Sequence, residues 1–334
     1  MTGQDRIQAL AEHGVEIHAF PESWTALAAD VLHGLSSTPK TLPPKWFYDA
    51  RGSELFDEIC DLPEYYPTRT EAALLADVGA RIAAEVPAAE VIELGSGSST
   101  KTPLLLDPLR DAGVLRRYVP VDVSAAAIQG AIPALTARYP GVEIDARICD
   151  FTTDLCDLPA PTGAPRIVAF LGSTIGNLQP VEVQAFLAQV RPLLGPHDAL
   201  LLGTDLVKDV AVLEPAYDDA AGVTAAFNRN VLAVINRELQ ADFVLDAFDH
   251  DAAWNPVLER IEIRLRSVCD QVVRIRALGL EVTFQAGESI LTEISRKFRR
   301  GGIERAYAQA GLGLRSWFQD PSAWYALSLA SIRD

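Results

Sequence analysis

Residues 90–207 alternate apolar, β-branched runs with helix-like stretches, and this alternation restricts the fold more than any other feature of the sequence. Apolar strands that are joined by helices form a parallel sheet with both faces covered. The pattern therefore predicts a doubly wound α/β sheet with five parallel strands. The predicted strands are residues 90–96, 116–123, 142–150, 166–177 and 198–207.

The first of these strands runs into a glycine-rich turn, VIELGSGSSTKT at residues 91–102. Gly95 and Gly97 allow positive φ and the close approach of a ligand, and the helix that follows offers free N–H groups. A dinucleotide fingerprint or a phosphate-binding P-loop would need glycine at position 100. Thr100 fits neither class, so the turn favours S-adenosylmethionine, which carries no phosphate.

Two acidic residues end the next strands, Asp122 the second and Asp150 the third. Ligands of an open parallel sheet bind across the carboxyl ends of its strands. Asp122 has the acceptors for a ribose diol, and Asp150 could accept from an adenine amino group with Phe151 beside the ring. A nicotinamide enzyme would share the turn and the first aspartate, whereas a P-loop NTPase would need an aspartate at the end of an apolar strand for magnesium.

The fourth strand instead ends on a short polar loop, FLGSTIGN. Methyl transfer from a sulfonium requires mainly a positioned, unprotonated nucleophile, and neither a metal nor a covalent residue. Gly172, Ser173, Thr174 and Asn177 suit the head group of an amino-acid acceptor. The loop is therefore predicted to hold the methyl acceptor.

Sequence outside this stretch predicts a second domain. Strict alternation returns at residues 259–284, with Ile261, Ile263 and Leu265 on one face, and indicates antiparallel strands of an inserted α+β domain. The C-terminal segment reads as a helix and two strands that close the first sheet. We expect a methyltransferase domain of residues 69–207 and 298–334, a substrate-binding domain of 18–68 and 208–297, and an N-terminal extension of 1–17.

Local signals predict helix ends and an aromatic cluster. Ser99 or Thr100 and Ser124 are expected as N-caps, and Gly34 is expected to end a helix that begins near residue 25. Residues 41–75 contain six aromatic side chains, whose faces attract a sulfonium or an ammonium, although packing is their commoner role.

Composition limits the partners. The net charge of −16 over 334 residues disfavours nucleic acid and anionic membranes, so we expect a small substrate. We also expect a monomer. The chain shows neither a secretory signal nor a membrane-spanning stretch, and its four cysteines are widely spread, which predicts a cytoplasmic protein with reduced thiols. Five scattered histidines show no metal-ligand spacing, and no metal is expected.

Several long blocks resemble the histidine-specific Nα-methyltransferases of ergothioneine biosynthesis, from about residue 35 to the C-terminus. They are LPPKWFYDARGSELFDEICDLPEYYPTRTE, ELGSGSSTKT, FLGSTIGNL, LLGTDLVKD, YDDAAGVTAAFNRNVLAVINREL and LTEISRKF. The resemblance implies a class I, Rossmann-like methyltransferase that trimethylates L-histidine to hercynine with S-adenosylmethionine.

The resemblance also implies a role for individual residues. Cofactor contacts are expected at Gly95, Gly97, Lys101, Asp122, Asp150 and Phe151. The substrate carboxylate is expected at Asn177 and Tyr217, and its amino group near Tyr65, Gly172 and Thr174. Glu293 and Ser295 would bind the imidazole, with Tyr48 and Phe56 closing the pocket.

Ile263 departs from the family pattern, which commonly has methionine there beside the imidazole. A β-branched residue changes the shape of a pocket. Histidine remains the expected substrate, with tryptophan or tyrosine as an alternative. A non-catalytic S-adenosylmethionine-binding regulator is a further alternative, which the intact site residues oppose.

Overall fold

The computed structural model describes residues 16–19, 23–150, 155 and 158–333. The chain divides into two compact units, each built from separate segments of the sequence. We call them the sheet unit (Met1–Phe20, Pro67–Val207 and Phe298–Asp334) and the insert unit (Pro21–Tyr66 and Lys208–Lys297).

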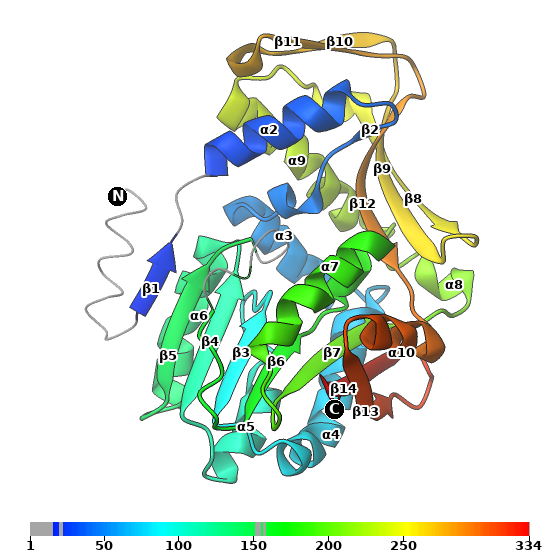
Figure 1. The fold of residues 1–334 in the computed structure, drawn as a ribbon. Coiled ribbons are helices and arrows are strands. Elements are labelled where there is room, and N and C mark those ends of the chain that lie inside the picture. The colour runs from blue at the N-terminus through cyan, green and yellow to red at the C-terminus, as the bar shows by residue number, and fades with distance from the viewer. Residues whose placement is uncertain (1–15, 20–22, 151–154, 156–157, 334) are drawn as a thin grey trace. The chain divides into compact units, whose positions relative to one another are not determined.

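An eight-stranded sheet forms the centre of the sheet unit, in the order β1-β5-β4-β3-β6-β7-β14-β13 (Figure 1). All five predicted strands are present and parallel to one another, which confirms the doubly wound α/β prediction. Strand order reverses at β3, since β4 and β6 lie on either side of it. The parallel strands are β3 (Glu90–Leu94), β4 (Arg117–Asp122), β5 (Glu143–Ile148), β6 (Arg166–Phe170) and β7 (Ala199–Asp205).

Helices cover both faces of this sheet. One core contains apolar side chains of α4, α5 and α6, and the other contains those of α7 and α10. The predicted closing hairpin is confirmed, because β14 pairs antiparallel with both β7 and β13. These elements are α4 (Tyr66–Glu85), α5 (Pro103–Asp111), α6 (Ala125–Arg138), α7 (Pro180–Val190), α10 (Arg300–Gln309), β13 (Leu312–Gln319) and β14 (Tyr325–Ile332).

The N-terminal strand β1 (Glu16–Ala19) corrects one expectation. It pairs in parallel with β5, so these residues belong to the sheet and not to an N-terminal extension or to the substrate-binding domain. A four-residue strand that includes glutamate and histidine has no continuous apolar run by which to recognise it.

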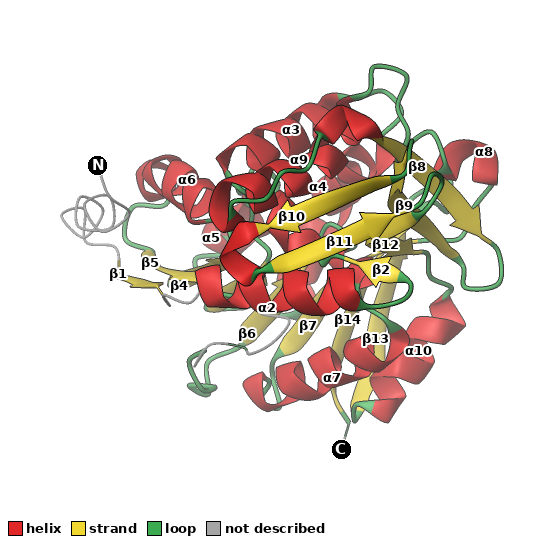
Figure 2. Cartoon of the chain, turned by 90° about the horizontal axis from the view of Figure 1, so that it is seen from above, coloured by secondary structure: helices red, strands yellow, loops and turns green. Residues whose placement is uncertain are grey.

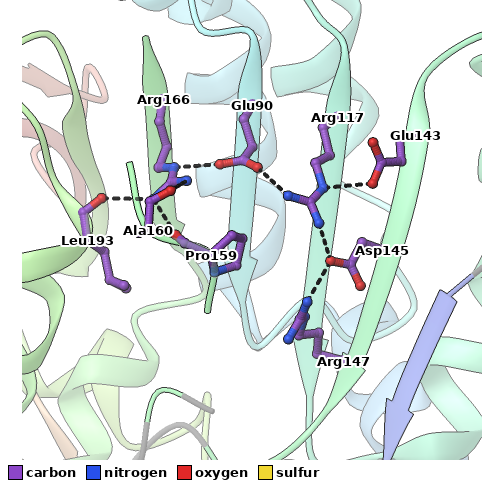
Figure 3. A network of polar contacts seen from close by, with 9 residues as sticks. All are labelled: Glu90, Arg117, Glu143, Asp145, Arg147, Pro159, Ala160, Arg166 and Leu193. Atoms are coloured by element: carbon purple, nitrogen blue, oxygen red, sulfur yellow. Dashed lines mark hydrogen bonds and ion pairs between the residues drawn. The ribbon is translucent and has the colours of Figure 1, made fainter. Parts of the chain in front are cut away.

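Charged residues connect the strands at the amino-terminal edge of the sheet (Figure 3). Glu90, Arg117, Glu143 and Arg166 are the first residues of β3, β4, β5 and β6. Glu90 accepts from both arginines, and Arg117 also pairs with Glu143 and Asp145. Arg166 is 1% exposed, and its remaining donors reach the carbonyls of Pro159, Ala160 and Leu193. This network fixes the strands at the edge opposite their carboxyl ends.

The insert unit contains a four-stranded sheet, in the order β2-β12-β9-β8, and a separate hairpin, β10-β11. Helix α2 lies along that hairpin (Figure 2). Ile261, Ile263 and Leu265 are buried, as their alternation predicts. The elements are α2 (Ser23–Ser36), β2 (Lys40–Thr41), α3 (Ala50–Asp61), α8 (Val210–Leu213), α9 (Val223–Leu239), β8 (Phe248–Asn255), β9 (Arg260–Ser267), β10 (Gln271–Ile275), β11 (Leu280–Phe284) and β12 (Ser289–Arg296).

Gly34 does not end its helix, because α2 continues to Ser36. A Cβ atom at this position would lie 2.1 Å from the carbonyl oxygen of Thr41. The glycine therefore permits the chain after the helix to approach it closely.

Candidate active site

The predicted cofactor turn follows β3 and leads into α5. Gly95, Gly97 and Ser99 have φ values of 70°, 53° and 55°. Among the described residues, apart from its two chain neighbours, no atom lies within 4 Å of the position that a Cβ atom would take at Gly97, so open space lies beside its backbone. The turn thus combines left-handed backbone with room for a ligand, as a close-contact binding turn requires.

The helix after this turn begins later than expected. Thr102 is the N-cap of α5, not Ser99 or Thr100. Its hydroxyl donates to Glu93 at 2.7 Å, and the Tyr118 hydroxyl donates to the same carboxylate oxygen at 2.6 Å. Burial raises the pKa of Glu93. Glu93 therefore links the far end of the turn, at Thr102, to the neighbouring strand β4 from inside the sheet.

Asp122 ends β4 with its carboxylate against the turn. One oxygen accepts from the Gly97 N–H at 2.8 Å and the other from the Ser124 N–H at 2.8 Å. A carboxylate has about four acceptor positions, so Asp122 can accept a further donor such as a ribose hydroxyl. Burial raises the pKa of Asp122 against the lowering effect of these N–H donors. Ser124 caps α6 as predicted, accepting from Ala127.

Asp150 lies two residues beyond the end of β5 and is half-buried. Since Asp122 pairs with Ile148 across β4 and β5, Asp150 follows at the same edge of the sheet. Phe151, predicted to flank the adenine, lies outside the described residues.

The neighbouring Cys149 is disulfide-bonded, contrary to the expectation of reduced thiols, whereas Cys60 and Cys269 are free. Wide spacing along the sequence does not by itself prevent such a pairing.

Sequence reasoning did not identify Glu71, a fully buried carboxylate on α4. It pairs with the predicted cofactor residue Lys101, and it accepts from the Gly172 N–H at 2.8 Å and from the Tyr325 hydroxyl at 2.6 Å. A lone glutamate in an amphipathic helix gives no signal of such a role. Glu71 connects the cofactor turn to the loop after β6, which is the predicted acceptor loop.

That loop is held in an unusual backbone conformation. Gly172 and Ser173 have φ values of 73° and 56°, and the Ser173 hydroxyl accepts from the Asp205 N–H at 2.9 Å. Thr174 donates to the Leu171 carbonyl at 3.0 Å, and Asn177 ends the short 3₁₀ helix that follows (Thr174–Asn177). Gly172 is exposed, while Thr174 and Asn177 are half-buried, so the loop is accessible at the carboxyl edge.

The other predicted substrate residues lie in the insert unit, where four aromatic rings form a continuous chain. Tyr48 contacts Phe56 at 5.6 Å between ring centroids, Phe56 contacts Tyr65 at 6.3 Å, and Tyr65 contacts Tyr217 at 6.0 Å. Phe227, which the sequence did not indicate, packs on Tyr48 and Phe56. The rings of the predicted pocket are therefore in contact within this unit.

Desolvation raises the pKa of Tyr65 well above its ordinary value, with further contributions from nearby groups that include Tyr217 and Glu293. The Tyr65 hydroxyl therefore stays protonated at neutral pH. It can accept a hydrogen bond from an amine, but it is not a base that removes the proton of that amine.

Glu293 and Ser295 lie on β12, directly opposite Ile263 and Ile261 of β9. Opposed residues of antiparallel strands share a face of the sheet, so these four side chains lie together. Glu293 is half-buried, and Ile263 is 2% exposed. The Ser295 hydroxyl lies 2.9 Å from the Tyr217 hydroxyl, and Lys297 contacts both.

The predicted site residues thus form two groups, one in each unit. Gly95, Gly97, Lys101, Asp122, Asp150, Gly172, Thr174 and Asn177 belong to the sheet unit. Tyr48, Phe56, Tyr65, Tyr217, Ile263, Glu293 and Ser295 belong to the insert unit.

Among the described residues, no group of three or more His, Cys, Asp or Glu side chains could hold a metal ion, and no helix is long and apolar enough to cross a membrane.

A parallel sheet with its glycine turn after β3, an aspartate at the end of β4 and another after β5, and an antiparallel closing hairpin defines a class I S-adenosylmethionine-dependent methyltransferase. The sequence profile described as "Histidine-specific methyltransferase, SAM-dependent" matches residues 27–332. The chain belongs to this histidine-specific methyltransferase family.

Its relatives include two mycobacterial proteins named histidine N-alpha-methyltransferase. The protein of Mycolicibacterium smegmatis is 56% identical over 91% of this chain and 94% of its own length. That of Mycobacterium tuberculosis is 54% identical over 92% and 95%. Ergothioneine biosynthesis protein 1 of Neurospora crassa is 33% identical over 59% of this chain and 23% of its own length.

Proposed function

We propose that this protein transfers methyl groups from S-adenosylmethionine to the α-amino group of L-histidine, three in succession, and yields hercynine for ergothioneine biosynthesis. The identity of 56% to a histidine N-alpha-methyltransferase over 91% of the chain carries the proposal, because a match of this extent includes both units. The partner is a small amino acid, and we propose that the enzyme acts as a cytoplasmic monomer.

The sheet unit is proposed to hold the cofactor. Gly95 and Gly97 would admit it at the turn, Asp122 would accept from its ribose hydroxyls, and Asp150 with Phe151 would bind its adenine. Lys101 would contact it from the end of the turn, just before α5. The acceptor positions left on Asp122 and the open space at Gly97 support this assignment.

The insert unit is proposed as the substrate-binding domain. Tyr217, with Asn177 of the sheet unit, would donate to the substrate carboxylate, and Glu293 and Ser295 would pair with the two imidazole nitrogens. Tyr65, Gly172 and Thr174 would surround the amino group, and Tyr48 and Phe56 would close the pocket. Ile263 lies beside Glu293 in the sheet and would shape the imidazole end.

The chemistry requires little beyond position. When bound, S-adenosylmethionine would supply an electrophilic methyl group on a sulfonium. The lone pair of the neutral amine would attack the methyl carbon in line, and the thioether would leave with the electrons of the broken C–S bond. Each transfer starting from the ammonium form releases one proton, and that proton can leave to water because the amine titrates not far above neutral pH. Protonated Tyr65 would orient the amine by accepting a hydrogen bond. The face of its ring would stabilise the positive charge of the methylammonium as methyl groups are added.

Mass spectrometry tests the proposal directly. Purified protein with S-adenosylmethionine and L-histidine should give products with one, two and three added methyl groups. A panel of the twenty amino acids separates histidine from tryptophan and tyrosine. A protein that binds the cofactor in calorimetry but methylates none of them would be a regulator, and the proposal would fail.

Glu293→Ala tests the substrate assignment. We expect the ratio of kcat/KM for histidine to that for tryptophan to fall about 10–100-fold, the equivalent of one lost charge-assisted hydrogen bond. Glu281→Ala is the matched control, since Glu281 is an exposed glutamate of the same unit that pairs with Arg274. An unchanged ratio in Glu293→Ala would refute the assignment of Glu293 to the imidazole site.

A further inference from the structure

A buried lysine touches two of the proposed substrate residues. Lys297 follows β12 and is 3% exposed. Its ammonium donates to the Tyr217 hydroxyl at 2.7 Å and to the Ser295 hydroxyl at 2.8 Å, and those hydroxyls lie 2.9 Å apart. It also lies 4.5 Å from the centroid of the Tyr217 ring. The three groups form a closed triangle within the insert unit.

The donors in this triangle determine which way its protons point. An ammonium only donates, so both hydroxyl oxygens accept from Lys297. The two hydroxyls carry two protons, and their mutual hydrogen bond uses one of them. A ligand with two acceptors can break that mutual bond, because Lys297 keeps both oxygens hydrogen-bonded while both protons turn outward.

We propose that Lys297 is a positioning residue that makes Tyr217 and Ser295 donors towards the substrate. The inference rests on the proposed function, in which Tyr217 meets a carboxylate and Ser295 meets an imidazole nitrogen. Both hydroxyls then find acceptors, and Glu293 accepts from the remaining imidazole N–H. The side chain so recognised carries one donor and one acceptor nitrogen, as neutral imidazole does.

This arrangement distinguishes imidazole from indole. The indole nitrogen is a donor only, so it can satisfy Glu293 but leaves the Ser295 proton without an acceptor in the substrate. A site built around a hydrogen bond discriminates strongly against a ligand that cannot make it. Lys297 thereby contributes to substrate choice without touching the substrate.

Lys297→Met tests the proposal, because methionine retains much of the length of the side chain and removes the donor. We expect the KM for histidine to rise about 10–100-fold, as for the loss of one charge-assisted hydrogen bond, with the Kd for S-adenosylmethionine unchanged. Lys297→Arg should recover most of this loss, since it restores a donor. Lys40→Met is the matched control, because Lys40 contacts Glu288 and the Phe284 ring of the same unit.

A double mutant distinguishes positioning from a purely structural role. If Lys297 acts through Ser295, the effects of Lys297→Met and Ser295→Ala on the KM for histidine should be less than additive. Additive effects, or an unchanged KM in folded Lys297→Met, would overturn the proposal. The proposal would also be overturned if Lys297→Met had a lower thermal midpoint and lost affinity for the cofactor and for histidine equally. If Lys297→Met does not fold, Lys297→Gln takes its place, and an unchanged KM overturns the proposal there too.

The two proposals fail in different ways. Wild-type protein that methylates another amino acid and not histidine would refute the proposed function. The same Lys297 variants, measured with that amino acid, still test the donation from Tyr217 to its carboxylate. Wild-type protein that trimethylates histidine, with no effect in the folded variants, would refute the role of Lys297 alone.

Discussion

Replacing Arg166 with methionine should destabilise the sheet without weakening the cofactor site. Arg166→Met removes a guanidinium that is 1% exposed and keeps an unbranched chain in its place. The change removes the hydrogen bond to Glu90 and the bonds to three carbonyl groups. All of these contacts lie around the amino edge of the sheet, whereas the proposed cofactor residues follow the carboxyl ends of its strands.

The size of the effect follows from what remains around Glu90. Removal of one partner from a buried ion pair costs about 3–5 kcal/mol. Glu90 is 6% exposed but keeps Arg117 at 3.0 Å, so we expect the lower part of that range. The Ala160 carbonyl belongs to an exposed residue and can bind water instead. A loss near 3 kcal/mol is large beside a typical total of about 5–15 kcal/mol.

Urea unfolding followed by circular dichroism measures the free energy of unfolding, and calorimetry without urea measures the Kd for S-adenosylmethionine. Arg110→Met is the control, because Arg110 pairs with Asp107 and Asp111 on the surface, and its urea midpoint should hardly change. Two results would refute the reasoning about Arg166→Met. One is a midpoint as high as in the wild type, and the other is a weakened Kd in protein whose circular dichroism is native.

Two further predictions concern the carboxyl edge. Asp122→Asn should raise the Kd for S-adenosylmethionine about tenfold or more. Burial raises the pKa of Asp122 above 3.8, so this carboxylate takes up a proton at a higher pH than an ordinary aspartate does. The affinity of the wild type for S-adenosylmethionine should therefore fall as the pH is lowered. Calorimetry from about pH 7 to about pH 4 should show no such fall in Asp122→Asn. Gly203→Ala should cost about 1–3 kcal/mol in urea unfolding, because its Cβ would lie 2.2 Å from Glu71 and 2.7 Å from Tyr325. Gly130→Ala should not lower the urea midpoint, because no described atom outside the local helix backbone lies within 4 Å of a Cβ atom there. Equal midpoints for the two glycine variants would contradict this packing argument.

The sequence predicted the sheet unit well because its strands are short apolar runs separated by clear helices. All five parallel strands and the closing hairpin were found in this way. Strands β1 and β2 escaped prediction because they are four and two residues long and pair with distant segments. Such strands are stabilised by the partner strand and not by a pattern of their own.

The sequence predicted site residues where chemistry repeats at strand ends, and it missed the residues that support them. Asp122 and Asp150 could be proposed because acids follow two successive strands. Glu71 and Lys297 act on neighbours that are far away in the chain, at Gly172 and Tyr217, so no local spacing marks them. The N-cap at Thr102 was missed for another reason, since its hydroxyl bonds to Glu93 and not to the N–H groups of the helix.

The pairing of β2 with β12 sets a minimum time for the insert unit to fold during synthesis. Thr41 of β2 is the register partner of Leu291 of β12, about 250 residues later in the chain. At a translation rate of about 5–20 residues per second, β2 waits roughly 12–50 s for its partner strand. The apolar sides of α2 and α3 pack in the core that contains α9 and Ile290, so that core is also incomplete during this interval. The apolar sides of α2 and α3 therefore stay incompletely covered in the nascent chain until β12 has been made.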